Sequence, residues 1–272
     1  MSDRVSDKVV TPLLVGLVEY LGNNPHVSDV KLQERKPANL QLLTSWEVKH
    51  GHSLPSDLQQ FYLTTNGFTL KWHVTINGDL VNIGHIHINS VQEVYQLVPP
   101  KDLPLAEMDI ISSHGDGPSF TTHHMFILSE VDCGRVCLCY EPVKDDDKYA
   151  SSCTAIWLLD NSWTWHHMTD SFTHFFRLAI CHLGLPEWPL LLTKYATISP
   201  QYQAWYHMFI PNRHKMDLLD AEVDGVAGSP DQPSINVLDV GRVFRRSHDP
   251  RLSRDKKKSS SQKGTMSYSS RH

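Results

Sequence analysis

The sequence predicts an α+β domain with a mostly antiparallel sheet flanked by helices, followed by a helical extension and a disordered tail. The order of the elements is the first observation. Amphipathic helical segments come first, alternating strand-like runs fill the middle, and an amphipathic helix closes the domain. The dipeptide Asn77-Gly78 is the second observation, because it lies between two alternating runs and is a strong hairpin signal.

Composition divides the chain into four segments. We expect an N-terminal helix and linker at 1–34, the α+β domain at 35–184, an aromatic-rich helical extension at 185–222 and a disordered, basic, serine-rich tail at 223–272. The chain has 272 residues, of which 40% are hydrophobic, so it can bury a substantial core.

Apolar residues at helical spacing predict five helices. Glycine and asparagine residues after several of them are typical stop signals. The predicted helices are 8–21 with Pro12 as an alternative start, 38–49, 55 to a stop at Asn66-Gly67, 170–183, and one that starts at Ser199-Pro200 and ends at Phe209.

Alternating apolar and polar residues predict the strands. The expected strands are 69–76, 80–88, 125–131, 135–140 and 155–159, with a short edge strand at 160–165. Between the second and third strands, 90–97 is expected to form a short helical turn, because Ser90 and Glu93 have capping-box spacing.

One stretch carries a family resemblance. It contains Trp46-Glu47, Leu54-Pro55-Ser56-Asp57-Leu58, Phe61-Tyr62 and Asn66-Gly67-Phe68. This combination resembles the signature of the SUKH superfamily, which includes bacterial toxin-immunity proteins and a fungal cell-wall regulator. The resemblance implies a SUKH-like α+β fold over about residues 35–184, ending in a helix that begins in Ser-Phe and crosses the sheet.

The chain as a whole also resembles a family of animal subunits of the tubulin polyglutamylase complex. This resemblance implies a noncatalytic scaffold that supports ATP-dependent addition of glutamate to tubulin. The implied partners are a tubulin-tyrosine-ligase-like catalytic subunit, other subunits of the complex, and tubulin or microtubules. The implied location is the cytoplasm and cytoskeleton, at microtubules, the centrosome or centriolar satellites, and the basal body of the cilium.

Other features bear on the compartment. The sequence has no run of eighteen apolar residues, so we expect no membrane insertion. The N-terminal residues carry acids and lack an apolar core with a cleavage site, which argues against secretion. Five cysteines are an odd number, which favours reduced thiols in the cytosol.

Motifs for chemistry are scarce. The sequence contains no phosphate-binding loop, no dinucleotide fingerprint and no Gly-x-Ser-x-Gly elbow. Seventeen histidines, including His85, His87 and the pairs His123-His124 and His166-His167, suggest an alternative function as a metal-dependent hydrolase. Structural zinc sites need paired ligands at fixed spacing, which this chain lacks, so we predict no metal, no cofactor and no catalytic residue.

The aromatic extension offers candidate partner-binding residues, because buried aromatic anchors dominate the energetics of interfaces. We predict Trp188, Trp205, Tyr206 and Phe209 as these anchors. The alternative is that the same side chains only cover the chain's own sheet.

Charge is divided unevenly along the chain. Residues 242–272 hold ten basic and two acidic side chains, a net charge of +8, whereas residues 1–241 have a net charge of −13. We predict that the tail binds an acidic protein surface; the alternative is a solvated, phosphorylatable or nuclear-localisation segment. Nucleic acid is a poor fit, because the tail lacks an aromatic stacking platform. The candidate contacts are Arg245, Arg246, Lys256, Lys257 and Lys258.

Overall fold

The computed structural model describes residues 12–98, 110–111, 124–140, 154–193 and 197–224. These residues confirm the predicted α+β class and form two sheets. The three-stranded sheet has the order β1-β2-β3, with β1 (Asp29–Glu34), β2 (Phe68–Ile76) and β3 (Asp79–Ile88). The six-stranded sheet has the order β4-β6-β7-β8-β9-β5, formed by β4 (Tyr95–Gln96), β5 (Ile110–Ile111), β6 (Met125–Val131), β7 (Gly134–Tyr140), β8 (Thr154–Asp160) and β9 (Trp165–Thr169).

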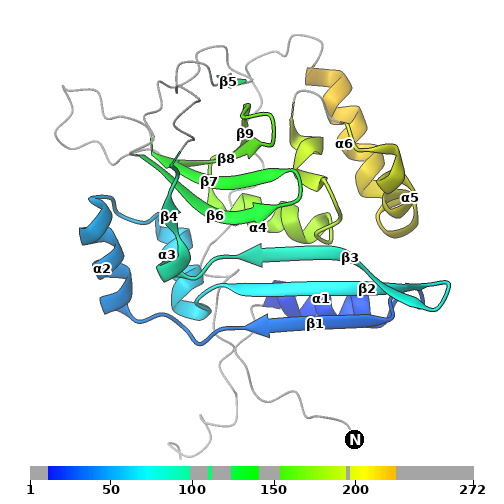
Figure 1. Ribbon diagram of the computed structural model, residues 1–272, viewed down its shortest axis with the longest axis horizontal. Helices are drawn as coiled ribbons and strands as arrows, with labels where there is room; N and C mark the ends of the chain where they lie inside the picture. The colour runs from blue at the N-terminus through cyan, green and yellow to red at the C-terminus, as the bar shows by residue number, and fades with distance from the viewer. Residues whose placement is uncertain (1–11, 99–109, 112–123, 141–153, 194–196, 225–272) are drawn as a thin grey trace, which may run out of the picture.

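The strand pairs are antiparallel except for the short parallel pair of β5 with β9. Helices surround the two sheets (Figure 1): α2 and α3 lie at one end, α5 and α6 at the other, and α1 lies behind the three-stranded sheet. The helices are α1 (Pro12–Gly22), α2 (Leu40–His50), α3 (Ser56–Thr64), α4 (Phe172–Cys181), α5 (Pro200–Phe209) and α6 (Pro211–Asp224), with short 3-10 helices η1 (Val91–Glu93) and η4 (Trp188–Leu192). None of the helices in the described residues has the length and apolarity to cross a bilayer.

Asn89, at the end of β3, joins the two sheets. Its backbone N–H donates to the carbonyl of Leu128 at 2.9 Å, and its side-chain amide donates to Ile127 at 3.3 Å. The hydroxyl of Tyr62 in α3 donates to the carbonyl of Asn89 at 3.1 Å. Buried polar groups need such partners, so this residue fixes how the sheets and α3 meet.

The Trp46-Glu47 pair of the signature ties α2 to its surroundings. The indole N–H of Trp46 donates to the carbonyl of Val94 at 3.0 Å. The Glu47 carboxylate accepts from the backbone of Leu54 at 2.9 Å and from the Gln59 amide at 3.0 Å. Glu47 therefore organises the α2–α3 connection.

Asp57 acts over a longer distance than its place in α3 suggests. Its side chain is buried, and one carboxylate oxygen accepts from the Thr173 backbone N–H at 2.8 Å and the Thr173 hydroxyl at 3.0 Å. Thr173 lies in the first turn of α4, where backbone N–H groups lack helical partners. Asp57 therefore caps α4 across 116 residues of sequence.

Trp72 lies at the centre of the three-stranded sheet and is fully buried. Its indole N–H donates to the carbonyl of Leu183, just after α4, at 2.8 Å, and its ring meets Phe209 of α5 at 4.7 Å. The cross-strand partner is Gly84, where an added Cβ would lie 1.7 Å from the indole nitrogen. Glycine at 84 therefore makes room for the tryptophan.

Several local predictions agree with the structure. Asn77 and Gly78 have φ of 53° and 93° and turn β2 into β3, as a type I′ hairpin requires. Ser90 and Glu93 form the predicted capping box. The last predicted helix of the domain is present as α4, and its N-cap Ser171 accepts from the His174 backbone.

Other expectations need correction. The segment expected as linker contains β1, which pairs with β2, because Val30 and Leu32 face the core. The edge strand expected at 160–165 begins only at Trp165, because the Asp160 carboxylate accepts from the backbones of Ser162 and Thr164 and forms a turn. The turn expected at 90–97 shortens to η1 and is followed by β4, which pairs with β6.

The Asp57 cap can be tested by substitution. Asp57→Ala removes the acceptor for two donors of Thr173, so we expect the free energy of unfolding to fall by about 2 kcal/mol. Chemical denaturation monitored by circular dichroism measures this. Asp170→Ala, next to α4 but exposed, is the matched control with an expected loss below about 0.5 kcal/mol. Equal losses in both variants would contradict the long-range cap.

Candidate functional site

Three of the four predicted anchors lie inside the chain's own core. Trp188 packs between the rings of Phe175 and His182, at 5.8 and 5.3 Å. Tyr206 is buried, and its hydroxyl donates to the carbonyl of Pro186 at 2.7 Å. Phe209 is buried against Trp72. These side chains hold the extension against the domain, as the alternative expectation described.

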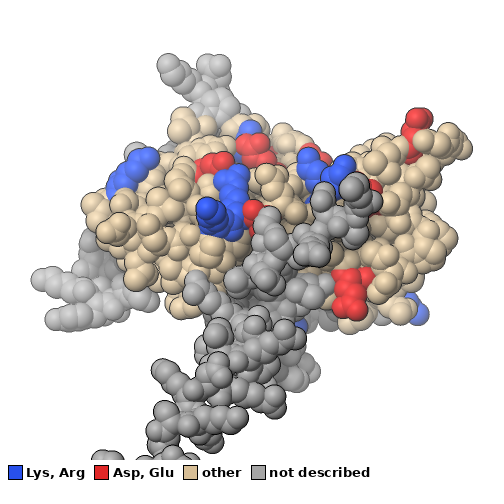
Figure 2. Space-filling model, turned by 90° about the horizontal axis from the view of Figure 1, so that it is seen from below, with Lys and Arg blue, Asp and Glu red and all other residues tan. Residues whose placement is uncertain are grey.

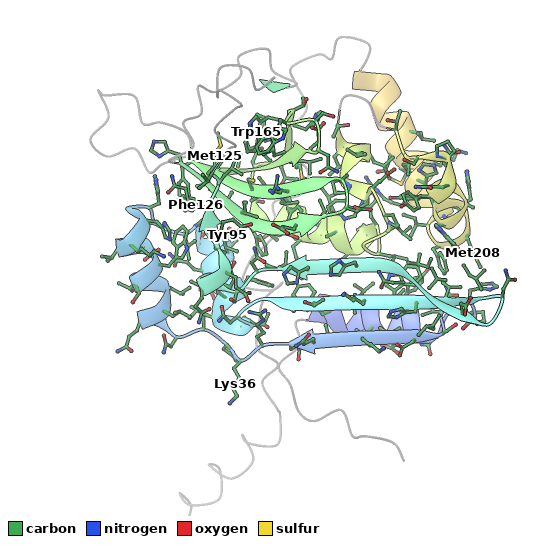
Figure 3. The ribbon with its side chains drawn as sticks, viewed as in Figure 1. Lys36, Tyr95, Met125, Phe126, Trp165 and Met208 are labelled. Atoms are coloured by element: carbon green, nitrogen blue, oxygen red, sulfur yellow. The ribbon has the colours of Figure 1, made fainter. Side chains whose placement is uncertain are left out.

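Trp205 is the anchor that keeps exposed surface. It is half-buried and stacks on Phe209 at 6.3 Å. Ala204 and Met208 are exposed and share its helical face. Figure 3 shows Met208 at the α5 end of the molecule, away from α2. Because α5 contains no Asp, Glu, Lys or Arg, this exposed face is uncharged, and binding of a partner there stays a prediction.

A buried polar cluster fastens α6 to α4. The His182 ring is fully buried, with Nδ1 2.7 Å from the Leu178 carbonyl and Nε2 2.9 Å from the Asp217 carboxylate. Both neighbours are acceptors, and Asp217 also accepts from the Arg213 guanidinium, so the Asp217 carboxylate joins the end of α4 to α6. The sequence analysis missed this cluster, since nothing local links residues 182 and 217.

A second polar connection anchors the start of the extension. The backbone N–H of Glu187 donates to Asp132 at 3.0 Å, in the turn between β6 and β7. The Glu187 carboxylate accepts from the Ser199 backbone at 2.7 Å and hydroxyl at 2.8 Å, just before α5. Burial raises the pKa of Asp132 above its usual value. Glu187 therefore ties the start of the extension to the domain and also closes the first loop of the extension onto the start of α5.

The histidines proposed for a metal site do not converge. His166 lies 3.0 Å from Asp160 and His167 lies 3.0 Å from Asp170, each in its own pair, and His123 lies outside the described residues. His85 and His87 share a strand face, where burial first and then Lys71 lower the pKa of His85 to about 4. Within the described ranges, no three His, Cys, Asp or Glu side chains gather as metal ligands would.

The thiols serve packing. Cys137 and Cys139 face one side of β7 and are buried among apolar side chains. Burial raises the pKa of Cys137 to about 12, far above the range in which a thiolate forms at neutral pH. Cys181 is the exposed thiol among the described cysteines.

A smaller aromatic cluster was not anticipated. His52 and His124 share a hydrogen bond of 3.1 Å, and His52 stacks on Tyr140 at 4.3 Å. Tyr140 in turn donates to the carbonyl of Ser53 at 3.0 Å. The cluster fixes the α2–α3 loop against β7, so its role is positioning. The residues of the predicted basic contact, Arg245, Arg246 and 256–258, lie outside the described residues.

Comparison with known proteins identifies the domain. A family model described as SMI1 / KNR4 family (SUKH-1) matches residues 37–178. The chain belongs to the SMI1/KNR4 (SUKH-1) family. This confirms the SUKH resemblance carried by the α2–α3 stretch. The SUKH-1 match begins just before α2 and ends within α4, so β1 and the extension lie outside it.

Relatives resemble more of the chain than the SUKH-1 domain alone. Rat, mouse and human proteins, each named tubulin polyglutamylase complex subunit 2, are 32% identical over 252, 252 and 248 residues. The similarity covers 86% of this chain and 79%, 79% and 78% of the relatives, respectively. No solved structure matches the chain.

The His182–Asp217 cluster makes a prediction about α6. Asp217→Asn removes the buried carboxylate that bonds His182 and balances the Arg213 guanidinium, so the contact between α6 and α4 should weaken by about 3 kcal/mol. Hydrogen exchange should show loss of protection in 211–218 before loss in β2. Lys215→Ala, exposed on the same helix, should leave the protection unchanged. Retained protection in Asp217→Asn would show that apolar packing alone holds α6.

Proposed function

We propose that this chain is a noncatalytic scaffold subunit of a tubulin polyglutamylase complex. In this role it supports ATP-dependent addition of glutamate to tubulin by a tubulin-tyrosine-ligase-like catalytic partner. The observation that carries the proposal is the similarity over 86% of the chain to proteins named tubulin polyglutamylase complex subunit 2. That similarity exceeds the extent of the SUKH-1 domain and so includes residues beyond it.

The polar side chains that join separate helices and loops support a scaffold role for the chain. His182, Asp217 and Asp57 are buried in contacts that join one element to another, and the more exposed Asp132 makes such a contact with Glu187. Groups that a catalytic site would leave available to substrate are here engaged in holding helices and loops. The extension adds a rigid, uncharged outer face at α5, which is the kind of surface that meets another chain.

Trp205 tests the proposal, because it is the predicted anchor with exposed surface. In a complex reconstituted from purified subunits, Trp205→Ala should reduce binding of this chain at least about tenfold, as loss of a central aromatic anchor does. Glutamate addition to tubulin, followed by mass spectrometry, should fall in parallel. A complex that retains wild-type affinity and activity with Trp205→Ala would argue against docking through α5.

Two controls separate docking from folding. Trp163→Ala removes a half-buried tryptophan of the β8–β9 turn, outside the extension, and should leave binding unchanged. The melting temperature of each free variant shows whether it folds. The isolated wild-type chain, given ATP, Mg²⁺, glutamate and tubulin, should form no product; product formed by this chain alone would overturn the proposal.

The basic tail supplies a second contact in this proposal. Figure 2 shows Lys and Arg side chains mixed with Asp and Glu on the face seen from below, without a field of one sign. The net charge of +8 in 242–272 therefore complements an acidic surface better than that described face does.

We also propose that the chain works at microtubules, the centrosome or centriolar satellites and the basal body of the cilium. A tagged chain spread evenly through the cell would contradict this location.

Neutralising the tail tests this contact. Replacing Lys256, Lys257 and Lys258 by Gln should reduce co-pelleting with microtubules about threefold to tenfold at low salt, because each exposed charge contributes a modest, screened attraction. The effect should shrink at high salt. Replacing Ser259, Ser260 and Ser261 by Ala keeps the charge and should leave pelleting unchanged. Equal pelleting of all three proteins at low salt would dispose of the contact.

A further inference from the structure

An open apolar groove lies between α1 and α4. Its volume is about 390 Å³, at the lower end of the range of ligand pockets. The lining residues come from α1, from α4 and the residue after its cap, and from the junction of α5 with α6: Gly16, Leu17, Tyr20, Ile180, Cys181, Leu183 and Ile210. At Gly16 an added Cβ would meet nothing within 4 Å, so the groove is open on the α1 side.

The chemistry of the lining selects an apolar occupant. The polar side-chain groups in it are the hydroxyl of Tyr20, which donates to the Phe209 carbonyl at 3.4 Å, and the thiol of Cys181. Neither group balances a charge, and the other side chains are aliphatic or absent. A segment rich in apolar side chains therefore gains most by entering the groove, since apolar burial scales with the area removed from water.

The sequence after α6 contains one such segment. Six of the ten residues in 235–244 are aliphatic or aromatic, whereas the other residues of 225–272 include only five. The six are Ile235, Val237, Leu238, Val240, Val243 and Phe244. Apolar side chains that lie close together in a charged, serine-rich sequence are stabilised when they pack on an apolar surface.

The length of chain permits this segment to reach the groove. Ile210, in the groove, immediately precedes α6, whose 14 residues span about 21 Å. The twelve residues 225–236 can extend over about 40 Å, which is enough to return along the helix.

We propose that residues 237–244 bind in the groove between α1 and α4 of the same chain. The apolar side chains of the segment cover Tyr20 and Ile180, which keep exposed surface in the groove, and the segment shields the Cys181 thiol from solvent. The basic run that begins at Arg242 is then held beside α1. An acidic partner attracted by these arginines would consequently lie against the α1–α4 side of the molecule. The docking is independent of the proposed function and has its own test.

Alkylation of Cys181 reports on the groove. Cys133, Cys137 and Cys139 are buried, and a Cys153→Ser substitution removes the fifth thiol. N-ethylmaleimide then reacts with Cys181, and intact-mass spectrometry measures the rate of alkylation. If the segment fills the groove about nine-tenths of the time, Val240→Asp with Phe244→Asp should raise the rate on the order of tenfold. The matched control, Leu252→Asp with Met266→Asp in the same tail, should react at the wild-type rate.

A disulfide crosslink tests whether the segment lies next to Cys181. Phe244→Cys should form an intramolecular disulfide with Cys181 on mild oxidation with copper–phenanthroline, whereas Met266→Cys should not. Equal alkylation rates in all the tail variants would overturn the proposal. A wild-type rate that falls as protein concentration rises would also overturn it, because a second copy would then be the occupant. Equal crosslinking of Cys181 with Phe244→Cys and with Met266→Cys would show that the tail contacts the groove without preference for one segment. That result would also overturn the proposal.

Discussion

The contact on which the arrangement depends is the burial of the Trp72 indole. The ring occupies the space that Gly84 leaves on the neighbouring strand, its N–H is satisfied by Leu183 beyond α4, and its edge meets Phe209 of α5. Gly184 follows with φ of 62° and approaches β3 so closely that a Cβ would lie 2.6 Å from the His85 carbonyl oxygen. One side chain thus joins the sheet, the helix that crosses it and the extension.

Elements whose signals are local could be predicted from the sequence. The Asn77-Gly78 turn requires positive φ at two successive residues, and few other dipeptides adopt this conformation. The capping box of Ser90 and Glu93 depends on residues three apart. Amphipathic helices such as α4 also show their apolar face directly in the residue spacing. For these elements, the physics that forms them acts within about ten residues.

Elements defined by distant partners were missed or misplaced. β1 has only two inward apolar residues, Val30 and Leu32, and becomes a strand because β2 pairs with it 40 residues later. Asp57 lies in the first turn of its own helix, but its carboxylate caps α4, which begins more than a hundred residues later. The aromatic residues of the extension were recognised as needing burial, but the sequence could not distinguish burial against their own domain from burial against another chain. His182 and Asp217 gave no signal at all, because only the fold brings α4 and α6 together.

The position of Leu183 has a consequence for dissecting the molecule. A fragment cut to the family match at 37–178 would discard the carbonyl that accepts the Trp72 indole and the strand that pairs along β2. The Trp72 indole N–H and the edge of β2 would then lose their hydrogen-bond partners in the fragment. A loss of binding by such a fragment would therefore report misfolding and not a missing contact surface. The contacts that hold β2 and Trp72 therefore extend beyond the homology boundary, from β1 to Leu183.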